Sequence, residues 1–244
     1  MTADVARILG ARGLKMLVTG VIALVLAIGT LTVAGPAANA AGQAPALGTA
    51  ANLAVLAGNA LTCSDGIILG NVGVYSGALT QTSCPISGTI AVVDTVAGAA
   101  QTDFVTAYNQ FAALPCDQTL ATLVTLTLEP GVYCFDADAT ATGKILTLAG
   151  PANGIWIFKI GVLGTGALTG TSFGVFMAGG GQASNVYWQS AQAVTMTDST
   201  FLGTILAGEG ITMTRGTFHG AALSNAGVTI TGTAVTGFAG AGGN

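Results

Sequence analysis

The amino-acid sequence predicts a mainly β protein, a parallel β-solenoid with one long α-helix packed alongside it. Three observations predict this class: a regular repeat near the C-terminal end, many short strand patterns separated by glycine, and a single amphipathic helical segment. Charged residues make up only 7% of the 244 residues, well below the usual quarter. Solubility must therefore come from threonine, serine, asparagine and glutamine side chains and from exposed backbone.

The repeat occupies residues 194–238, and its three lines begin at equal intervals, at Val194, Ile211 and Val228. The period aligns threonines and glycines in columns: Thr195, Thr212 and Thr229; Thr197, Thr214 and Thr231; Gly203, Gly220 and Gly237. Such a repeat is typical of a solenoid, in which each line makes one coil and each column stacks on its copy about 4.7 Å away. Alternation along each strand places the apolar residues of VTMT, ITMT and VTIT inside and the threonines outside.

One segment, from Asp94 to Leu114, has a helical pattern. Asp94 can cap its start, and Pro115 ends it. Its apolar residues recur at steps of three or four and form one stripe: Val96, Ala100, Phe104, Ala107 and Phe111. We expect this stripe to pack along one side of the solenoid.

The segment 1–41 differs from the rest of the chain. Arg7, Arg12 and Lys15 precede an apolar run that ends in Ala38-Asn39-Ala40. This arrangement predicts an export signal cleaved near residue 41, which leaves residues 42–244 as a single secreted domain. The alternative is a retained transmembrane anchor, because the run approaches the roughly 20 residues that a bilayer needs.

The charges left after cleavage exclude several classes of partner. Three basic residues remain against nine acidic ones, a net charge of −6. A basic stripe for nucleic acid or anionic lipid is absent, so we expect neither partner and no obligate membrane association.

All four cysteines lie in the exported part, where disulfides persist. Four cysteines allow three pairings, which the sequence does not separate strictly. The simplest joins neighbours, Cys63 with Cys84 and Cys116 with Cys134, and each bond would stabilise the fold by roughly 3 kcal/mol. A zinc site is the alternative, but the chain has no C-x-x-C pair and its one histidine, His219, is remote, so we expect no metal.

Five segments carry a resemblance to a known family: LGTAANLAVLAG (47–58), LTLEPGVYCF (126–135), GIWIFKIG (154–161), NVYWQ (185–189) and FLGTILAGEGITM (201–213). Together and in this order they resemble the ice-binding-like family of secreted microbial proteins, once catalogued as a domain of unknown function. The resemblance covers residues 47–238 and implies a right-handed β-solenoid, here of about six to seven coils, with a parallel helix. It also implies one flat face that adsorbs to ice.

The loose ice-binding pattern of that family is T-A/G-x-T/N. Four quartets here are similar to it, beginning at Thr169, Thr197, Thr214 and Thr231. Together with the threonine columns they give the candidate ice-binding residues: Thr169, Ser172, Thr195, Thr197, Thr200, Thr212, Thr214, Thr217, Thr229 and Thr231. We expect one solenoid face to carry Thr197, Thr200, Thr214, Thr217 and Thr231. Asp198 and Arg215 interrupt the pattern, and a charge on an adsorbing plane would order its own hydration.

The predicted function is therefore that of a monomeric, secreted ice-binding protein whose partner is the ice crystal surface. It would cause thermal hysteresis and inhibit ice recrystallisation. The alternative is a surface adhesin or matrix protein that binds carbohydrate or cells, with Trp156, Tyr187 and Trp188 as aromatic platforms. Their neighbours alternate like core strands, which favours burial of at least two of them.

An enzyme of the polysaccharide lyase or hydrolase class is also a known use of a β-solenoid. It needs paired carboxylates or a carboxylate, arginine and lysine cluster in one groove. Only Asp136 and Asp138 are close in sequence, and Asp198, Arg215 and His219 could approach across coils. We expect no catalytic residues and no cofactor.

Overall fold

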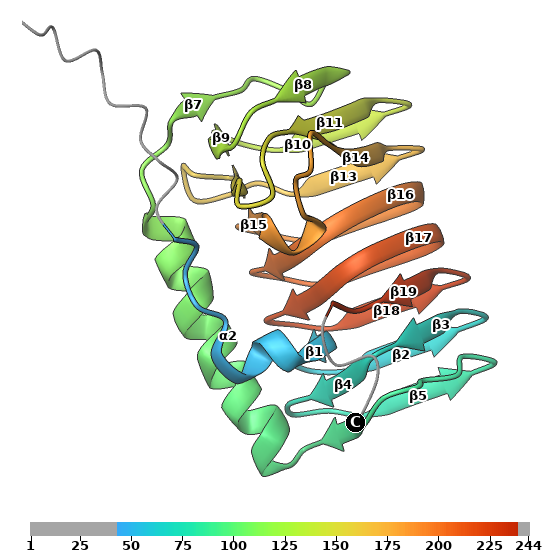
Figure 1. Cartoon of the computed structure of the whole chain (residues 1–244). Helices are drawn as coiled ribbons and strands as arrows, with labels where there is room; N and C mark the ends of the chain where they lie inside the picture. The colour runs from blue at the N-terminus through green and yellow to red at the C-terminus, as the bar shows by residue number, and fades with distance from the viewer. Residues whose placement is uncertain (1–42, 239–244) are drawn as a thin grey trace, which may run out of the picture. The chain divides into compact units, whose positions relative to one another are not determined.

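The computed structural model describes residues 43–238, which form a stack of coils with one long helix along its side (Figure 1). The export signal predicted for residues 1–41 lies outside the described residues. Each strand pairs in parallel with the strand of the next coil. Among the described residues, no helix has the length and apolar character needed to span a membrane. The predicted mainly β, parallel solenoid with one helix beside it is confirmed.

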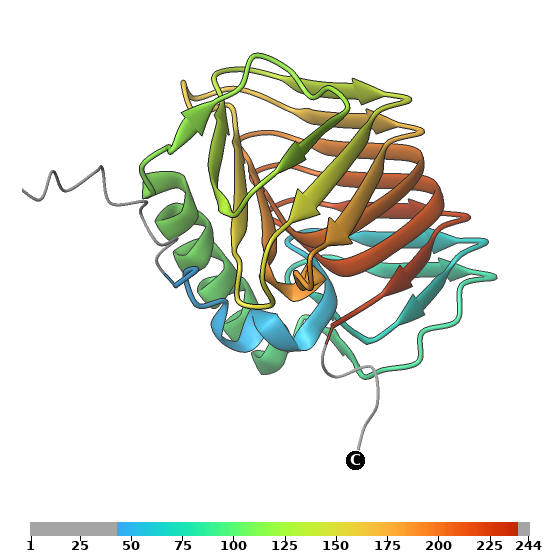
Figure 2. The ribbon, with the colours of Figure 1, turned by 45° about the horizontal axis from the view of Figure 1, so that its top comes forward.

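The strands form three faces, and two long strands bend through all three of them. These are β16 (Val194–Ala207) and β17 (Ile211–Ser224). Their first four residues belong to what we call the threonine face, their middle residues to the groove face and their last four to the helix face. Figure 2 shows the coils wrapping around a shared interior, with the helix on one side.

The other strands of each face are shorter. On the threonine face they are β10 (Ala139–Thr142), β13 (Leu168–Thr171), β18 (Val228–Thr231), β2 (Leu61–Ser64) and β5 (Leu79–Thr82). On the groove face they are β8 (Leu126–Leu128), β11 (Ile145–Ala149), β14 (Gly174–Ala178), β19 (Ala234–Thr236) and β3 (Ile67–Leu69). On the helix face they are β7 (Gln118–Thr119), β9 (Gly131–Phe135), β12 (Trp156–Ile160), β15 (Val186–Ser190), β1 (Leu53–Ala57), β4 (Asn71–Val74) and β6 (Ile90–Val92). With β16 and β17, the threonine face has seven strands, which agrees with the six to seven coils expected.

The order of the coils in space differs from their order in the chain. The chain begins with β1 to β6 at one end of the stack, and α2 (Thr95–Ala113) then carries it to the opposite end (Figure 1). The following coils return until β18 pairs with β2 and β19 pairs with β3. β1 pairs with β17 and supplies the third side of the coil that β18 and β19 begin. The stack is thus closed by segments from both ends of the described chain.

The interior is filled by a ladder of aromatic rings from successive coils. Neighbouring ring centroids lie 3.9–6.1 Å apart in the series Tyr133, Phe158, Trp188, Phe201 and Phe218. Trp156 and Trp188 are fully buried, and each indole N–H donates to a backbone carbonyl oxygen. The predicted burial of two of the three candidate aromatic platforms is confirmed.

The long helix begins and ends where the sequence predicts. The Asp94 carboxylate accepts a hydrogen bond from the Ala97 N–H at 2.8 Å, and the helix ends at Ala113, two residues before Pro115. Its buried residues face the helix face of the solenoid: Ala97, Ala100, Gln101, Phe104, Ala107 and Phe111.

Val96 was expected on this stripe, and it is instead 57% exposed. The reason is helical geometry. At about 100° per residue, Val96 points roughly 80° away from the direction of Phe104, whereas Ala97 points only about 20° away.

The end of the helix is held to the solenoid by polar and covalent contacts. The buried Lys159 ammonium donates a hydrogen bond to the carbonyl oxygen of Leu114, the residue that directly follows the helix. Burial lowers the pKa of Lys159 because the charged form loses hydration. A disulfide between Cys116 and Cys134 follows directly.

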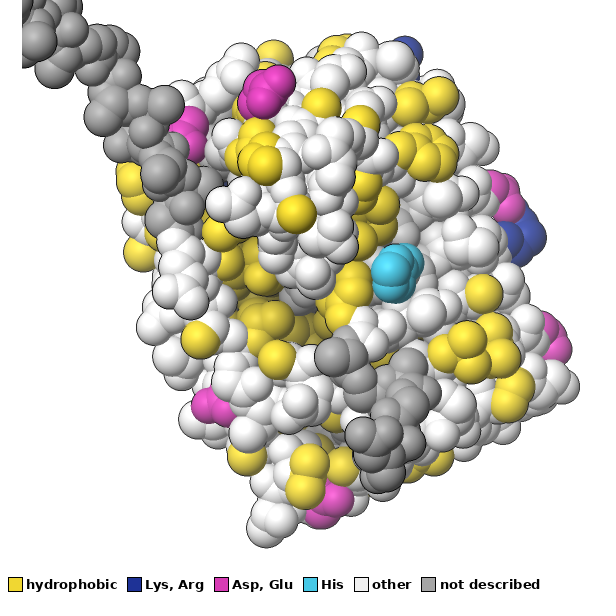
Figure 3. Space-filling view, viewed as in Figure 1, with side chains coloured by type: hydrophobic (Ala, Val, Ile, Leu, Met, Phe, Trp, Pro, Cys, Tyr) yellow, Lys and Arg dark blue, Asp and Glu magenta, His cyan; other side chains and the backbone are white. Residues whose placement is uncertain are grey.

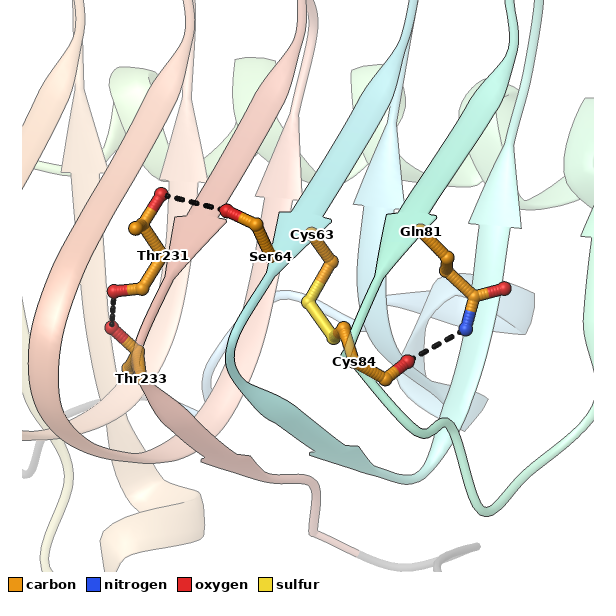
Figure 4. The surroundings of a disulfide bond; sticks show 6 residues. All are labelled: Cys63, Ser64, Gln81, Cys84, Thr231 and Thr233. Atoms are coloured by element: carbon orange, nitrogen blue, oxygen red, sulfur yellow. Dashed lines mark hydrogen bonds between the residues drawn. A yellow bond between two sulfur atoms is a disulfide. The ribbon is translucent and has the colours of Figure 1, made fainter.

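The second disulfide closes the opposite end of the stack. Cys63 on β2 bonds to Cys84, whose carbonyl oxygen accepts from the Gln81 side-chain amide at 2.7 Å (Figure 4). Both disulfide pairings predicted from sequence proximity are confirmed, with Cα atoms 5.8 Å apart in each.

The packing of the helix gives a first prediction. Phe104 is 1% exposed, so Phe104→Ala should lower the free energy of unfolding by about 3–5 kcal/mol through lost burial and a residual cavity. Its neighbour Val105 is 40% exposed, and Val105→Ala should change stability by less than about 0.5 kcal/mol. Urea denaturation of the two variants and the wild type makes the comparison. Equal destabilisation by both would contradict the packing described.

Candidate functional site

The threonine face carries two outward columns of hydroxyl side chains that run through all seven strands. The first column is Thr140, Thr169, Thr195, Thr212, Thr229, Thr62 and Thr80, in spatial order. The second is Thr142, Thr171, Thr197, Thr214, Thr231, Ser64 and Thr82. Each member pairs in register with the same position of the next coil. All fourteen side chains are partly or fully exposed.

The columns arise from strand alternation. Six of the seven strands have the form apolar-T-x-T or A-T-A-T, and β2 has Ser64 in place of the second threonine. The first and third residues are buried in every strand except β5, which lies at the end of the stack. In β16 these are Val194 and Met196, which are 0% and 3% exposed. Strand geometry then fixes the lattice: neighbours are about 4.8 Å apart between strands and about 6.7 Å apart along a strand. Seven strands give a plane roughly 29 Å long.

Half of this site was missed in the sequence. The missed positions are Thr62, Ser64, Thr80, Thr82, Thr140, Thr142 and Thr171. The signal that could have found them is the same four-residue pattern in LTCS, LTQT, ATAT and LTGT. These lines do not keep the constant spacing of the C-terminal repeat because the loops between them differ in length.

The column hydroxyls are free for water. Ser64 Oγ donates to Thr231 Oγ1 at 3.4 Å, a long contact between the facing strands β2 and β18 (Figure 4). Within residues 43–238, the hydroxyls of the other column members make no hydrogen bond to protein groups. The face therefore presents a repeated array of methyl groups and unpaired hydroxyls.

A column of left-handed residues ends the plane on the side of the groove face. One residue of each coil has a φ between 49° and 61°: Gly143, Ser172, Asp198, Arg215, Gly232, Asp65 and Ser83. This conformation turns the chain sharply, so the next residues belong to another face. Behind the turn, buried Ser199 and Thr233 donate to backbone carbonyls of the corner.

Small residues form the opposite edge of the plane. The N–H of the first residue in each strand donates to a backbone carbonyl oxygen just before the neighbouring strand of the stack. The residues that supply these oxygens are Ala167, Ala193, Gly210, Gly227, Ala60 and Ala78. At one end of this row, the Asp138 carboxylate accepts from the Ala167 N–H at 2.9 Å. Asp138 thus lies at a strand end.

The corner overturns one sequence-based expectation. Thr197 and Thr200 do not share a face, because Asp198 turns the chain between them, and Arg215 likewise separates Thr214 from Thr217. Thr200 and Thr217 lie on the groove face, where Thr200 pairs with Gly174. Ser172 lies on the corner itself. The T-x-x-T quartets therefore bridge two faces, whereas T-x-T pairs stay on one.

Two of the three charged residues of the repeat, Asp198 and Arg215, lie at the corner and bind one another. Arg215 Nε is 2.6 Å from Asp198 Oδ1, and Nη2 is 2.8 Å from Oδ2, a bidentate pair between adjacent coils. The hydrogen bond and charge of Arg215 lower the pKa of Asp198, and Asp198 raises that of Arg215. His219 lies apart on the groove face, in register with Leu202. The pair therefore sits at the edge of the threonine plane, where it neutralises its own charge.

The described residues gather no metal-binding group of three or more histidine, cysteine or acidic side chains. The regular feature of the molecule is instead the array of threonines on a rigid, parallel sheet.

Comparison with known proteins identifies the family to which the chain belongs. The family model described as Ice-binding-like matches residues 25–236. The chain belongs to the ice-binding-like family. The resemblance found in the five sequence segments is thereby confirmed.

Individual relatives agree with this assignment. An ice-binding protein of Nostoc sp. (strain HG1) is 40% identical over 169 residues, which cover 66% of this chain and 61% of that protein. One from Flavobacterium frigoris (strain PS1) is 32% identical over 185 residues, 67% of this chain and 65% of that protein. The matched region thus spans less than two thirds of the length of these two relatives.

The fold matches solved structures as well. The crystal structure of an ice binding protein from an Antarctic biological consortium superposes with a TM-score of 0.71 at 31% identity, over 80% of this chain and 92% of that one. The ice-binding protein of Antarctomyces psychrotrophicus gives a TM-score of 0.73 at 27% identity, over 79% of this chain and 98% of that one.

The corner ion pair gives a second prediction. In an NMR pH titration of the carboxyl groups, Asp198 should titrate below its usual range, and Arg215→Gln should return its pKa toward that range. Because the folded-state pKa is depressed, the pair's stabilisation is complete above the ordinary aspartate pKa and is lost as pH falls through the lowered one. Lys144→Gln is the control and should leave Asp198 unchanged. If the pKa of Asp198 were the same in Arg215→Gln as in the wild type, the pairing would be contradicted.

Proposed function

We propose that this chain binds ice crystals through the threonine face. The observation that carries the proposal is the pair of in-register columns, thirteen threonines and one serine, on one continuous sheet. Membership of a family whose named relatives are ice-binding proteins supports the choice of ligand. The export signal of residues 1–41, a single domain of residues 42–244, release outside the cell and a monomeric state are part of the same proposal.

Water ordering explains why these side chains suit ice. Hydroxyls hold water at lattice positions, while the threonine methyls limit the ways in which that water can exchange its partners. Threonine is β-branched and has few rotamers, so the array loses little side-chain entropy when it adsorbs. The face carries no charged side chain within its columns, so no ion hydration competes with this order.

Adsorption would change how ice grows. Molecules fixed on the ice front would force it to curve between them, which lowers the temperature at which it advances and produces thermal hysteresis. The same pinning would slow recrystallisation.

The adhesin alternative depended on exposed aromatic side chains, and the three candidates are not available for this role. Trp156 and Trp188 are buried in the core, and Tyr187 packs against Phe111 of the helix with ring centroids 4.9 Å apart. The ice-binding function is therefore preferred.

A third prediction identifies the face. Thr214→Tyr places a bulky ring in the centre of the threonine plane and should remove most of the thermal hysteresis and recrystallisation inhibition. Thr217→Tyr is the matched control, because Thr217 lies on the same strand but beyond the corner, and this variant should keep most of the activity. Circular dichroism melting of both variants checks that the fold is retained.

The two variants also separate the possible failures. If Thr217→Tyr loses activity and Thr214→Tyr keeps it, the groove face binds ice instead. If the folded wild type shows neither activity at high micromolar concentration, ice binding itself is wrong.

A fourth prediction concerns Ser64, the single member of the second column without a methyl group. Ser64→Thr completes the column and should raise thermal hysteresis, because the added methyl removes one gap and fixes the hydroxyl rotamer. Ser64→Ala, which removes the hydroxyl, should not produce the gain. An activity below wild type in a folded Ser64→Thr variant would contradict the lattice as described.

A further inference from the structure

The groove face contains a hollow that the proposed ice-binding function does not use. It has a volume of about 570 Å³, within the range of small-ligand sites. Phe201 and Phe218, each 2% exposed, lie at its base, and Ala183 of η2 (Ala183–Asn185) lines its rim. Figure 3 shows apolar side chains gathered in separate places on this side of the molecule, where the histidine is also visible. The uneven surface contrasts with the regular threonine face.

An aromatic ring is presented openly at this hollow. Phe176 is 46% exposed and is the one phenylalanine among the exposed large apolar residues of the described chain. A Cβ at Gly174 would lie 2.7 Å from the Phe176 ring, so the ring rests over a position that only glycine leaves open. The ring therefore lies close to the Gly174 backbone, while nearly half of the residue stays exposed to solvent.

Unpaired polar groups line the same hollow. Thr200, Thr217, Thr236 and His219 line the hollow. Their side chains make no hydrogen bond to another protein group in the described part of the chain. They can therefore donate to and accept from a ligand that carries hydroxyls.

The lining also excludes charged ligands. Among the described residues that form it, there is no aspartate, glutamate, lysine or arginine. An anionic or cationic ligand would lose its hydration here without gaining an opposite charge. A neutral ligand with one apolar side and several hydroxyls meets all three conditions.

We propose that this hollow binds one sugar residue of a neutral carbohydrate. The C–H side of the sugar ring packs on Phe176, and its hydroxyls bond to Thr200 and Thr217 and reach toward His219. The site lies beyond the corner from the threonine face, so one molecule can present one face to ice and the other to a neutral extracellular polysaccharide. The inference stands on the groove alone and does not depend on ice binding.

The single histidine makes a direct test possible, because its imidazole C–H signals need no assignment among several histidines. The whole secreted protein is titrated with methyl glycosides of glucose, galactose, mannose and N-acetylglucosamine, with glucuronate as the charged comparison. At least one neutral sugar should shift the His219 and Phe176 signals in a saturable way, with a Kd on the order of 1 mM. Phe176→Ala should weaken that binding about tenfold. Thr147 pairs with Phe176 across the strands but lies outside the hollow, so Thr147→Ala should leave sugar binding unchanged.

Three results would contradict the proposed site. The first is that none of the four sugars shifts the NMR signals in a saturable way up to about 0.1 M. The second is that Phe176→Ala binds the sugar as tightly as the wild type, and the third is that glucuronate binds as tightly as the neutral sugars. Thermal hysteresis measured on the same samples separates the two proposals. Phe176→Ala should keep its ice activity, and Thr214→Tyr should keep its sugar binding.

Discussion

The structure depends on in-register parallel stacking between coils. Each backbone hydrogen bond ties a residue to the equivalent residue of the next coil, so any side chain repeated at one position becomes a column. On the inner side of the sheet the columns give stacked ring pairs, Phe158 with Trp188 and Phe201 with Phe218. On the outer side they give the threonine array. The core and the proposed ice-binding surface therefore both depend on the same hydrogen bonds between coils, and a change in register would destroy both.

The corner converts this ladder into a bounded plane. A left-handed residue in every coil turns the chain after the second threonine, which limits each strand of the threonine face to a single T-x-T pair. The charged Asp198 and Arg215 lie on this edge, outside the threonine columns, and neutralise one another across coils. The same turn separates the threonine face from the groove face. One solenoid can thus carry two surfaces of different chemistry without either interfering with the other.

Closure of the stack makes the plane continuous. The β18–β2 junction joins segments from opposite ends of the described chain, yet the threonine columns cross it without a break because Thr229 pairs with Thr62 and Thr231 with Ser64. The helix covers the third face, and each disulfide secures one end of the stack. These contacts fix the rigidity that an adsorbing lattice requires. They also explain why the smooth plane is longer than the regular C-terminal repeat alone would provide.

The sequence by itself determined the solenoid class, the inward and outward residues of the repeat and the helix with its Asp94 cap, and it favoured the two disulfides that the structure contains. Each of these depends on local periodicity or on residues close in the chain. The tertiary structure alone decided which threonines share a plane. The left-handed turn at Asp198 moves Thr200 to another face, and loops of unequal length hide the alignment of Thr62 and Thr80 with Thr195. Register between distant strands is set by hydrogen bonds across coils, which no local pattern encodes. The groove around Phe176 likewise exists only because side chains from separate coils meet there.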